Sequence, residues 1–234
     1  MLTKRQLRQR MEYLNSNFLL YIEKFDDSKK FTGPSVYFHS RTLGKRRAHE
    51  TLEAVFDDEL FFEYLYATLT SWGMHRMGQG AKLVEFVEFV ESIQKARDNI
   101  IELKDFNILE INGVEVPLIC EKLWGIIDTI KVNIAKTKLV CNTKILHHFL
   151  PELSPPIDRE HTLRFFLNTK NGNLNKKTDE KYFRLIFPYF HYIGVQNSSV
   201  IKSLIGRTNF YTSTTKVIDN AIVGFVIKEL KKRR

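Results

Sequence analysis

Apolar residues recur at every third or fourth position along most of this chain of 234 residues, and strand-like alternation is almost absent. The stretch 57–72 shows the pattern, because it opens with Asp57 and Asp58 and continues with apolar residues at i, i+3 and i+4 spacing. Further helices are predicted over 82–103, 117–135, 138–150, 158–170, 181–195 and 214–230. Pro188 is expected to kink or split the helix over 181–195. The sequence therefore predicts an all-α fold.

Two stretches are candidates for strands, namely 35–43 and 106–117. The second contains Asn112-Gly113, a dipeptide typical of a tight hairpin turn. We expect at most one small hairpin near 106–117 on a helical body. No internal repeat or obvious linker divides the chain, so residues 1–234 are treated as one domain with a candidate seam between two lobes near 105–117.

Positive charge is the main compositional feature, since 36 Lys and Arg face 27 Asp and Glu and leave a net charge of +9. The excess gathers in three places: Lys4, Arg5, Arg8 and Arg10; Arg41, Lys45, Arg46 and Arg47; and Lys228, Lys231, Lys232, Arg233 and Arg234. Such a balance attracts phosphate backbones, but basic faces also raise solubility. Charge alone leaves both interpretations open.

Several classes of protein are disfavoured by what the sequence lacks. Cys120 and Cys141 have no CxxC spacing, so a disulfide framework and a zinc ribbon are both poorly supported. No apolar run approaches the roughly 20 residues that span a bilayer. The phosphate-binding loop, the dinucleotide glycine motif, HExxH and GxSxG are all missing. We expect a soluble, intracellular, cytoplasmic protein that uses no cofactor.

The adjacent histidines His147 and His148 point about 100° apart on a helix and do not easily share a metal. His148 and His161, with Asp158 nearby, would be the alternative two-histidine, one-carboxylate set. Scattered histidines are the commoner arrangement, and no metal site is predicted.

The segment TKILHHFLPELSPPIDREHTLRFF, residues 143–166, carries the most specific signal. An apolar helix leads through a proline-containing loop to Asp158, which opens the next helix. An aspartate there is a good helix cap, a role that in most cases explains such a residue by itself and that does not exclude a second one. The segment also resembles the helix, loop and aspartate of the helix-hairpin-helix DNA glycosylases, although no Gly-h-Gly turn occurs between Ile126 and Ile157.

This resemblance implies base excision, in which Asp158 matches the catalytic aspartate and Arg164 lies on the following helix. Lys144, 14 residues before Asp158, is the candidate for the amine of bifunctional members, although neither it nor Lys138, 20 residues before Asp158, matches the family pattern cleanly. An extruded base needs aromatic walls, for which Trp72 and Trp124 are candidates, although both fit helix cores as well. The candidate nucleic-acid-binding residues are Arg159, Arg164, Lys138, Arg46 and Arg47.

Two interpretations compete with an enzyme: a non-catalytic helical protein that binds nucleic acid or a protein partner, and a scaffold that uses its phenylalanine-rich helices. A catalytic Asp158 requires an open pocket with aromatic and basic neighbours, whereas a simple cap bonds to backbone N–H groups without a cleft. A scaffold would show a large exposed apolar patch. Two other stretches, FTGPSVYFH (31–39) and WGMHR (72–76), look like motifs to which the sequence assigns no function.

Overall fold

The computed structural model describes residues 2–28, 32–74, 82–135, 137–169 and 174–230. Within these ranges the chain forms thirteen α-helices and no strand, and a single isolated bridge joins Leu83 to Asn133. The predicted all-α class is confirmed. Across these ranges no helix combines the length and the apolar character that crossing a membrane requires.

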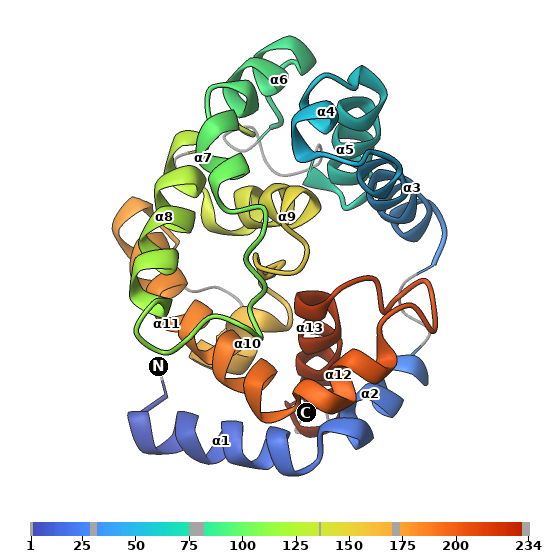
Figure 1. The fold of residues 1–234 in the computed structure, drawn as a ribbon. Coiled ribbons are helices and arrows are strands. Elements are labelled where there is room, and N and C mark those ends of the chain that lie inside the picture. The colour runs from blue at the N-terminus through green and yellow to red at the C-terminus, as the bar shows by residue number, and fades with distance from the viewer. Residues whose placement is uncertain (1, 29–31, 75–81, 136, 170–173, 231–234) are drawn as a thin grey trace.

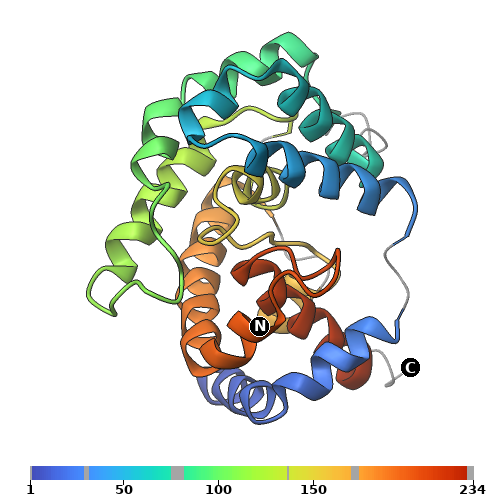
Figure 2. The same ribbon diagram turned by 45° about the vertical axis from the view of Figure 1, so that its right-hand side comes forward.

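The helices form two groups, one above the other in Figure 1. The upper group contains α3 (Pro34–Ala48), α4 (Leu52–Phe56), α5 (Glu59–Ser71), α6 (Phe86–Gln94), α7 (Arg97–Glu102), α8 (Val116–Thr129) and α9 (Leu139–Phe149). The lower group contains α1 (Lys4–Ser16), α2 (Phe18–Asp26), α10 (Thr162–Leu167), α11 (Lys176–Gln196), α12 (Ser198–Leu204) and α13 (Thr214–Phe225). The chain passes from one group to the other between α2 and α3, and returns between α9 and α10 (Figure 2).

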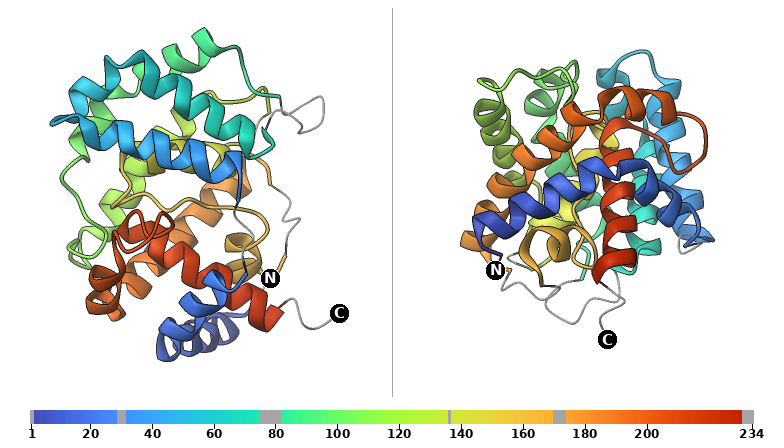
Figure 3. Two further views of the ribbon diagram at one scale, coloured as in Figure 1. Left: turned by 90° about the vertical axis from the view of Figure 1, so that its right-hand side faces the viewer. Right: turned by 90° about the horizontal axis from the view of Figure 1, so that it is seen from below.

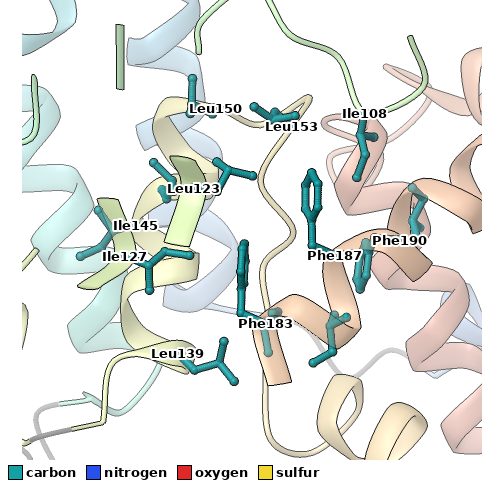
Figure 4. Close-up of a cluster of buried hydrophobic side chains, with 14 of the residues drawn as sticks. Ile108, Leu123, Ile127, Leu139, Ile145, Leu150, Leu153, Phe183, Phe187 and Phe190 are labelled. Carbon is teal, nitrogen blue, oxygen red and sulfur yellow. The ribbon is translucent and has the colours of Figure 1, made fainter. Parts of the chain in front are cut away.

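A buried apolar cluster connects the two groups where α11 packs against α8 and α9. Figure 4 shows its aromatic part, in which Phe183 and Phe187 of α11 lie on the side of Leu123 and Ile127 of α8, and Phe190 lies further along α11. None of these five side chains exposes any of its surface. In the lower group, α13 packs closely on α2, and Figure 3 shows the two helices side by side in the view from below. Almost every residue of α13 is buried.

The segment 35–43, a candidate strand, is part of helix α3. Pro34 lies in the first turn, where its missing N–H costs nothing. His39, Thr42 and Leu43 are the buried residues of α3, a helical spacing that packs on α5. Tertiary burial therefore outweighs the strand propensity of Val36, Tyr37 and Phe38.

The predicted hairpin near 106–117 does not form, and the segment consists of turns followed by the start of α8. The Asn112 side chain accepts hydrogen bonds from the backbone N–H groups of Val114 and Glu115, each at 3.0 Å. This local turn satisfies the groups that a hairpin would have paired. The segment joins α7 to α8, and the Ile108 N–H donates to the Glu152 carbonyl in the loop after α9.

Several predicted helices differ from the observed ones in their boundaries or course. The stretch 82–103 divides into α6 and α7, and because Ile93, Ala96 and Ile100 are all buried, the change of direction keeps both apolar faces inside. Helix α11 runs unbroken through Pro188, since phenylalanines on both sides of the proline are buried. Helix α13 ends at Phe225 and continues as a π-helical turn over Val226–Leu230.

Candidate functional site

A pocket of about 440 Å³ lies where the two helix groups meet. The lower group contributes residues of α2, α13 and the loop before α13, and the upper group contributes α3, α9 and the end of α5. The lining residues are Phe25, Ser35, Val36, His39, Ser71, Trp72, Gly73, Lys144, His147, Pro156, Asp158, Phe210, Lys216 and Asp219. A mixture of aromatic and charged groups in a hollow of this size is typical of a small-molecule site.

Asp158 is both a helix cap and a wall of this pocket. Its Oδ1 accepts hydrogen bonds from the backbone N–H groups of His161 at 2.6 Å and Thr162 at 3.1 Å, which begin α10. Its Oδ2 lies 3.0 Å from Nδ1 of His161. The helix starts at Thr162, four residues later than the sequence predicts. The side chain is still 24% exposed, so the cap does not close it off.

The carboxylate of Asp158 is held in its ionised form. Burial by itself raises its pKa, but the hydrogen bonds and charge of His161 and the nearby ammonium of Lys144 outweigh burial, and the pKa of Asp158 falls well below its ordinary value. Asp158 is therefore an anion throughout the physiological pH range. A fixed negative charge of this kind stabilises positive charge that develops in the pocket.

Lys144 projects from α9 into the same pocket, and its Nζ lies 4.9 Å from the centroid of the Trp72 ring. This cation–π contact places the ammonium on one face of the indole. Helix α9 is fixed at its start by Asp179, whose Oδ2 accepts the N–H groups of Lys138 at 2.7 Å and Leu139 at 3.2 Å. The structure thus brings together Asp158, Lys144 and Trp72, three residues that the sequence singled out separately.

Three histidines form the floor behind this group. Nδ1 of His148 lies 2.7 Å from the Lys144 carbonyl, and its Nε2 lies 3.0 Å from Nδ1 of His39. Nδ1 of His147 lies 3.0 Å from the Ser154 carbonyl. Both ring nitrogens of His148 have partners within the protein, whereas the side chains of His39 and His147 line the pocket. In the described part of the chain, no group of three or more His, Cys, Asp or Glu residues is arranged to hold a metal ion.

All three imidazoles are neutral at physiological pH. Burial lowers the pKa of His148 to about 4, although its bond to the Lys144 carbonyl opposes the shift. Burial, followed by repulsion between the imidazoles, holds the pKa of both His39 and His147 well below the ordinary value. The cluster therefore contributes uncharged nitrogen atoms to the pocket.

The histidine cluster predicts a loss of stability in mild acid. As the pH falls from 6.5 towards 4, histidines of the unfolded chain bind protons while His148 of the folded chain stays neutral. The free energy of unfolding should therefore fall by up to about 1.4 kcal/mol per pH unit from His148 alone. His39 and His147 act in the same direction, whereas Asp219, whose pKa burial raises, opposes them. Urea titrations at several pH values measure this slope, and an equal slope in His148→Gln would contradict the assignment.

Lys216 and Asp219 form the opposite wall, on α13. Nζ of Lys216 lies 2.6 Å from Oδ2 of Asp219, three residues further along the helix. The pair is largely buried, with side-chain exposures of 15% and 6%. Burial raises the pKa of Asp219 and the Lys216 charge opposes this shift. The pair therefore belongs to the pocket as well as to the helix.

The remaining candidate residues lie outside the pocket. Trp124 is buried in the core, with its ring centroid 5.9 Å from that of Phe183. Arg159 is exposed on the turn before α10. Four other cations bond to the protein itself: Arg46 to the Phe149 carbonyl, Arg47 to the Thr212 carbonyl, Arg164 to the Leu230 carbonyl, and Lys138 to Asp128. The C-terminal basic residues 231–234 lie outside the described residues.

Sequence reasoning did not find His39, His147, Lys216 and Asp219 as pocket residues. The stretches 31–39 and 72–76 were conspicuous, and the pocket takes Ser35, Val36 and His39 from the first and Trp72 and Gly73 from the second. In both stretches, aromatic residues stand beside a glycine and a histidine. Residues 31 and 75–76 of these stretches lie outside the described residues.

Comparisons of the chain with protein-family models, curated proteins and solved structures find no match.

Proposed function

We propose that the pocket binds a nucleobase extruded from a nucleic acid, and that Asp158 assists cleavage of its N-glycosidic bond. The observation that carries this proposal is the ionised carboxylate of Asp158 in one pocket with the Lys144 ammonium and the Trp72 ring. Asp158 accepts backbone N–H groups as a cap does, and it also lines an open hollow, which is the feature that a catalytic role requires. The resemblance of residues 143–166 to the helix-hairpin-helix glycosylases supports the same reaction.

The chemistry fits the groups present. When the bond between C1′ and the base nitrogen breaks, its electron pair leaves with the base and positive charge develops on the sugar. The Asp158 carboxylate stabilises that charge and orients a water molecule, whose oxygen bonds to C1′ and whose proton is taken up by the departing base. Trp72, Phe25 and Phe210 provide apolar walls for the extruded base. The net charge of +9 supplies attraction for the phosphate backbone.

The direct test is incubation of the protein with a panel of duplexes that each contain one damaged base. We expect release of the free base from at least one duplex, together with DNA binding that weakens as the salt concentration rises. Trapping with borohydride then tests whether Lys144 attacks C1′, because only an attacking amine leaves a covalent adduct. The absence of both base release and salt-dependent binding would refute the proposal.

The non-catalytic alternative rests on one specific observation, namely that both oxygens of Asp158 already have partners within the protein. In that case the pocket would bind a base without cleaving it. Salt-dependent binding of a duplex with no base release by the wild-type protein would favour this alternative.

The two tryptophans offer a matched pair of substitutions. Trp72→Leu should weaken binding of a fluorescent single-stranded oligonucleotide about tenfold or more, since stacking of one base contributes roughly 1–3 kcal/mol to binding. Trp124→Leu should lower the melting temperature instead, because Trp124 packs on Phe183 in the core. Fluorescence anisotropy at a temperature where both variants are folded measures the binding. Equal affinities for the two variants would exclude Trp72 as the stacking surface.

A further inference from the structure

Three buried acceptor atoms in the pocket have no hydrogen-bond partner among the described residues. They are Nε2 of His39, Nε2 of His147 and Oδ1 of Asp219. Their side chains come from α3, α9 and α13, and all three residues line the same pocket. His39 is 7% exposed, Asp219 5% and His147 not at all. Polar atoms are seldom left unpaired at such depth, which points to partners supplied by a ligand.

The protons on the two imidazoles follow from their fixed partners. A carbonyl oxygen only accepts, so Nδ1 of His148 carries a proton, and in the neutral ring its Nε2 accepts from Nδ1 of His39. His39 therefore has a bare lone pair at Nε2. In the same way, Nδ1 of His147 donates to the Ser154 carbonyl and leaves a lone pair at its Nε2. Both free nitrogens are acceptors, and the pocket offers no N–H of its own from either ring.

The carboxylate of Asp219 completes this arrangement. Its Oδ2 is bonded to the Lys216 ammonium, which opposes the rise in the pKa of Asp219 that burial causes, and its Oδ1 has no partner among the described residues. The rings of His39 and His147 lie nearly parallel, at an interplanar angle of 13° and a centroid separation of 6.1 Å. Two neutral nitrogens and one carboxylate oxygen are thus unpaired acceptors on residues that line the pocket from α3, α9 and α13.

We propose that His39, His147 and Asp219 form a specificity edge that selects a base with neighbouring N–H donors, as on the N1–H and 2-amino edge of a guanine-type purine. This inference rests on the proposed function and names the substrate class of the same pocket. A base whose matching edge carries carbonyl oxygens would leave the acceptors unpaired and add repulsion from Asp219. The three residues are positioning and specificity residues, and Asp158 remains the catalytic one.

The test compares two fluorescent oligothymidylates that carry one central deoxyguanosine or one central deoxyinosine. These bases differ only in the 2-amino group. We expect the wild-type protein to bind the deoxyguanosine strand about tenfold more tightly, the contribution typical of a hydrogen bond to a charged group. Asp219→Asn should bring the ratio close to one, because its side chain can offer an amide N–H in place of the acceptor. Asp57→Asn, at a surface position with 68% side-chain exposure, should leave the ratio unchanged.

The wild-type ratio alone decides the outcome if Asp219→Asn does not fold. Equal affinity for the two strands, or no binding of either, would overturn the inference, as would a ratio that Asp219→Asn leaves intact. Failure of the inference is distinguishable from failure of the proposed function, because base release is measured separately. Release of a damaged base together with equal affinities for deoxyguanosine and deoxyinosine would keep the glycosylase proposal and remove the specificity edge.

Discussion

Asp158→Asn is expected to reduce base release about 100-fold or more while leaving the protein folded, because it removes the charge but retains the cap. The asparagine amide oxygen accepts the same two backbone N–H groups, and Asn is about as good a helix cap as Asp. Loss of the ionised partner of His161 should lower the free energy of unfolding by about 1 kcal/mol. Single-turnover base release and urea unfolding measure the two effects separately.

Asp58→Asn provides a closely matched control. Asp58 caps α5 by accepting the Phe61 N–H, and its Oδ2 lies 2.6 Å from a histidine nitrogen, here Nε2 of His49. It therefore has the local chemistry of Asp158 at a position outside the pocket. Asp58→Asn should cost a similar amount of stability and leave base release unchanged. If both variants release base as fast as the wild-type protein, Asp158 is only a cap.

The fold class was predictable because most helices bury one apolar stripe, and that stripe is visible as local spacing. Helix α5 matched its predicted span closely, and its cap residue Asp58 was part of the acidic start. The errors arose where tertiary packing overrode local preference. The strand-prone Val36, Tyr37 and Phe38 became helical against α5, and Pro188 was retained inside α11 by the buried phenylalanines around it. Neither outcome depends on nearby sequence alone.

The candidate site was predictable only in part. Asp158 and Lys144 lie on one continuous segment whose helix and loop could be inferred locally, and the structure places both at the pocket. His39, Lys216 and Asp219 come from helices distant in sequence, and no local pattern reports that α3 and α13 face each other across a hollow. The basic candidates stay predictions: Arg46 and Arg164 lie outside the pocket, and each bonds to a backbone carbonyl of the protein itself.

Gly224→Ala is expected to be among the most destabilising single substitutions in the chain. An added Cβ at Gly224 would overlap the Tyr21 carbonyl oxygen, lie 2.7 Å from the Tyr21 carbonyl carbon and 3.1 Å from the Phe25 nitrogen. These are backbone atoms of α2 that no change of rotamer can move. The two helices would have to separate, at a cost of about 3 kcal/mol or more in the free energy of unfolding. Urea unfolding of the purified variant measures the loss.

Gly125→Ala is the matched control, because Gly125 lies inside α8 and an added Cβ would meet nothing within 4 Å. Alanine is favoured over glycine within a helix by roughly 1 kcal/mol, so this variant should be more stable than the wild-type protein. The same substitution is thus expected to have opposite signs at two helical positions. If Gly125→Ala lost as much stability as Gly224→Ala, the close crossing of α2 and α13 would not be the cause of the destabilisation at Gly224.

The crossing at Gly224 also connects stability to the pocket. Phe25 on α2 and Lys216 and Asp219 on α13 are three of the pocket's lining residues, so the distance between these helices sets the width of one wall. If Gly224→Ala remains folded, its binding of the deoxyguanosine strand should weaken, because α2 would move away from α13 and carry Phe25 with it. If Gly224→Ala were destabilised but bound the strand with unchanged affinity, α2 and α13 would have separated away from the pocket, and Phe25 would have kept its position beside Asp219.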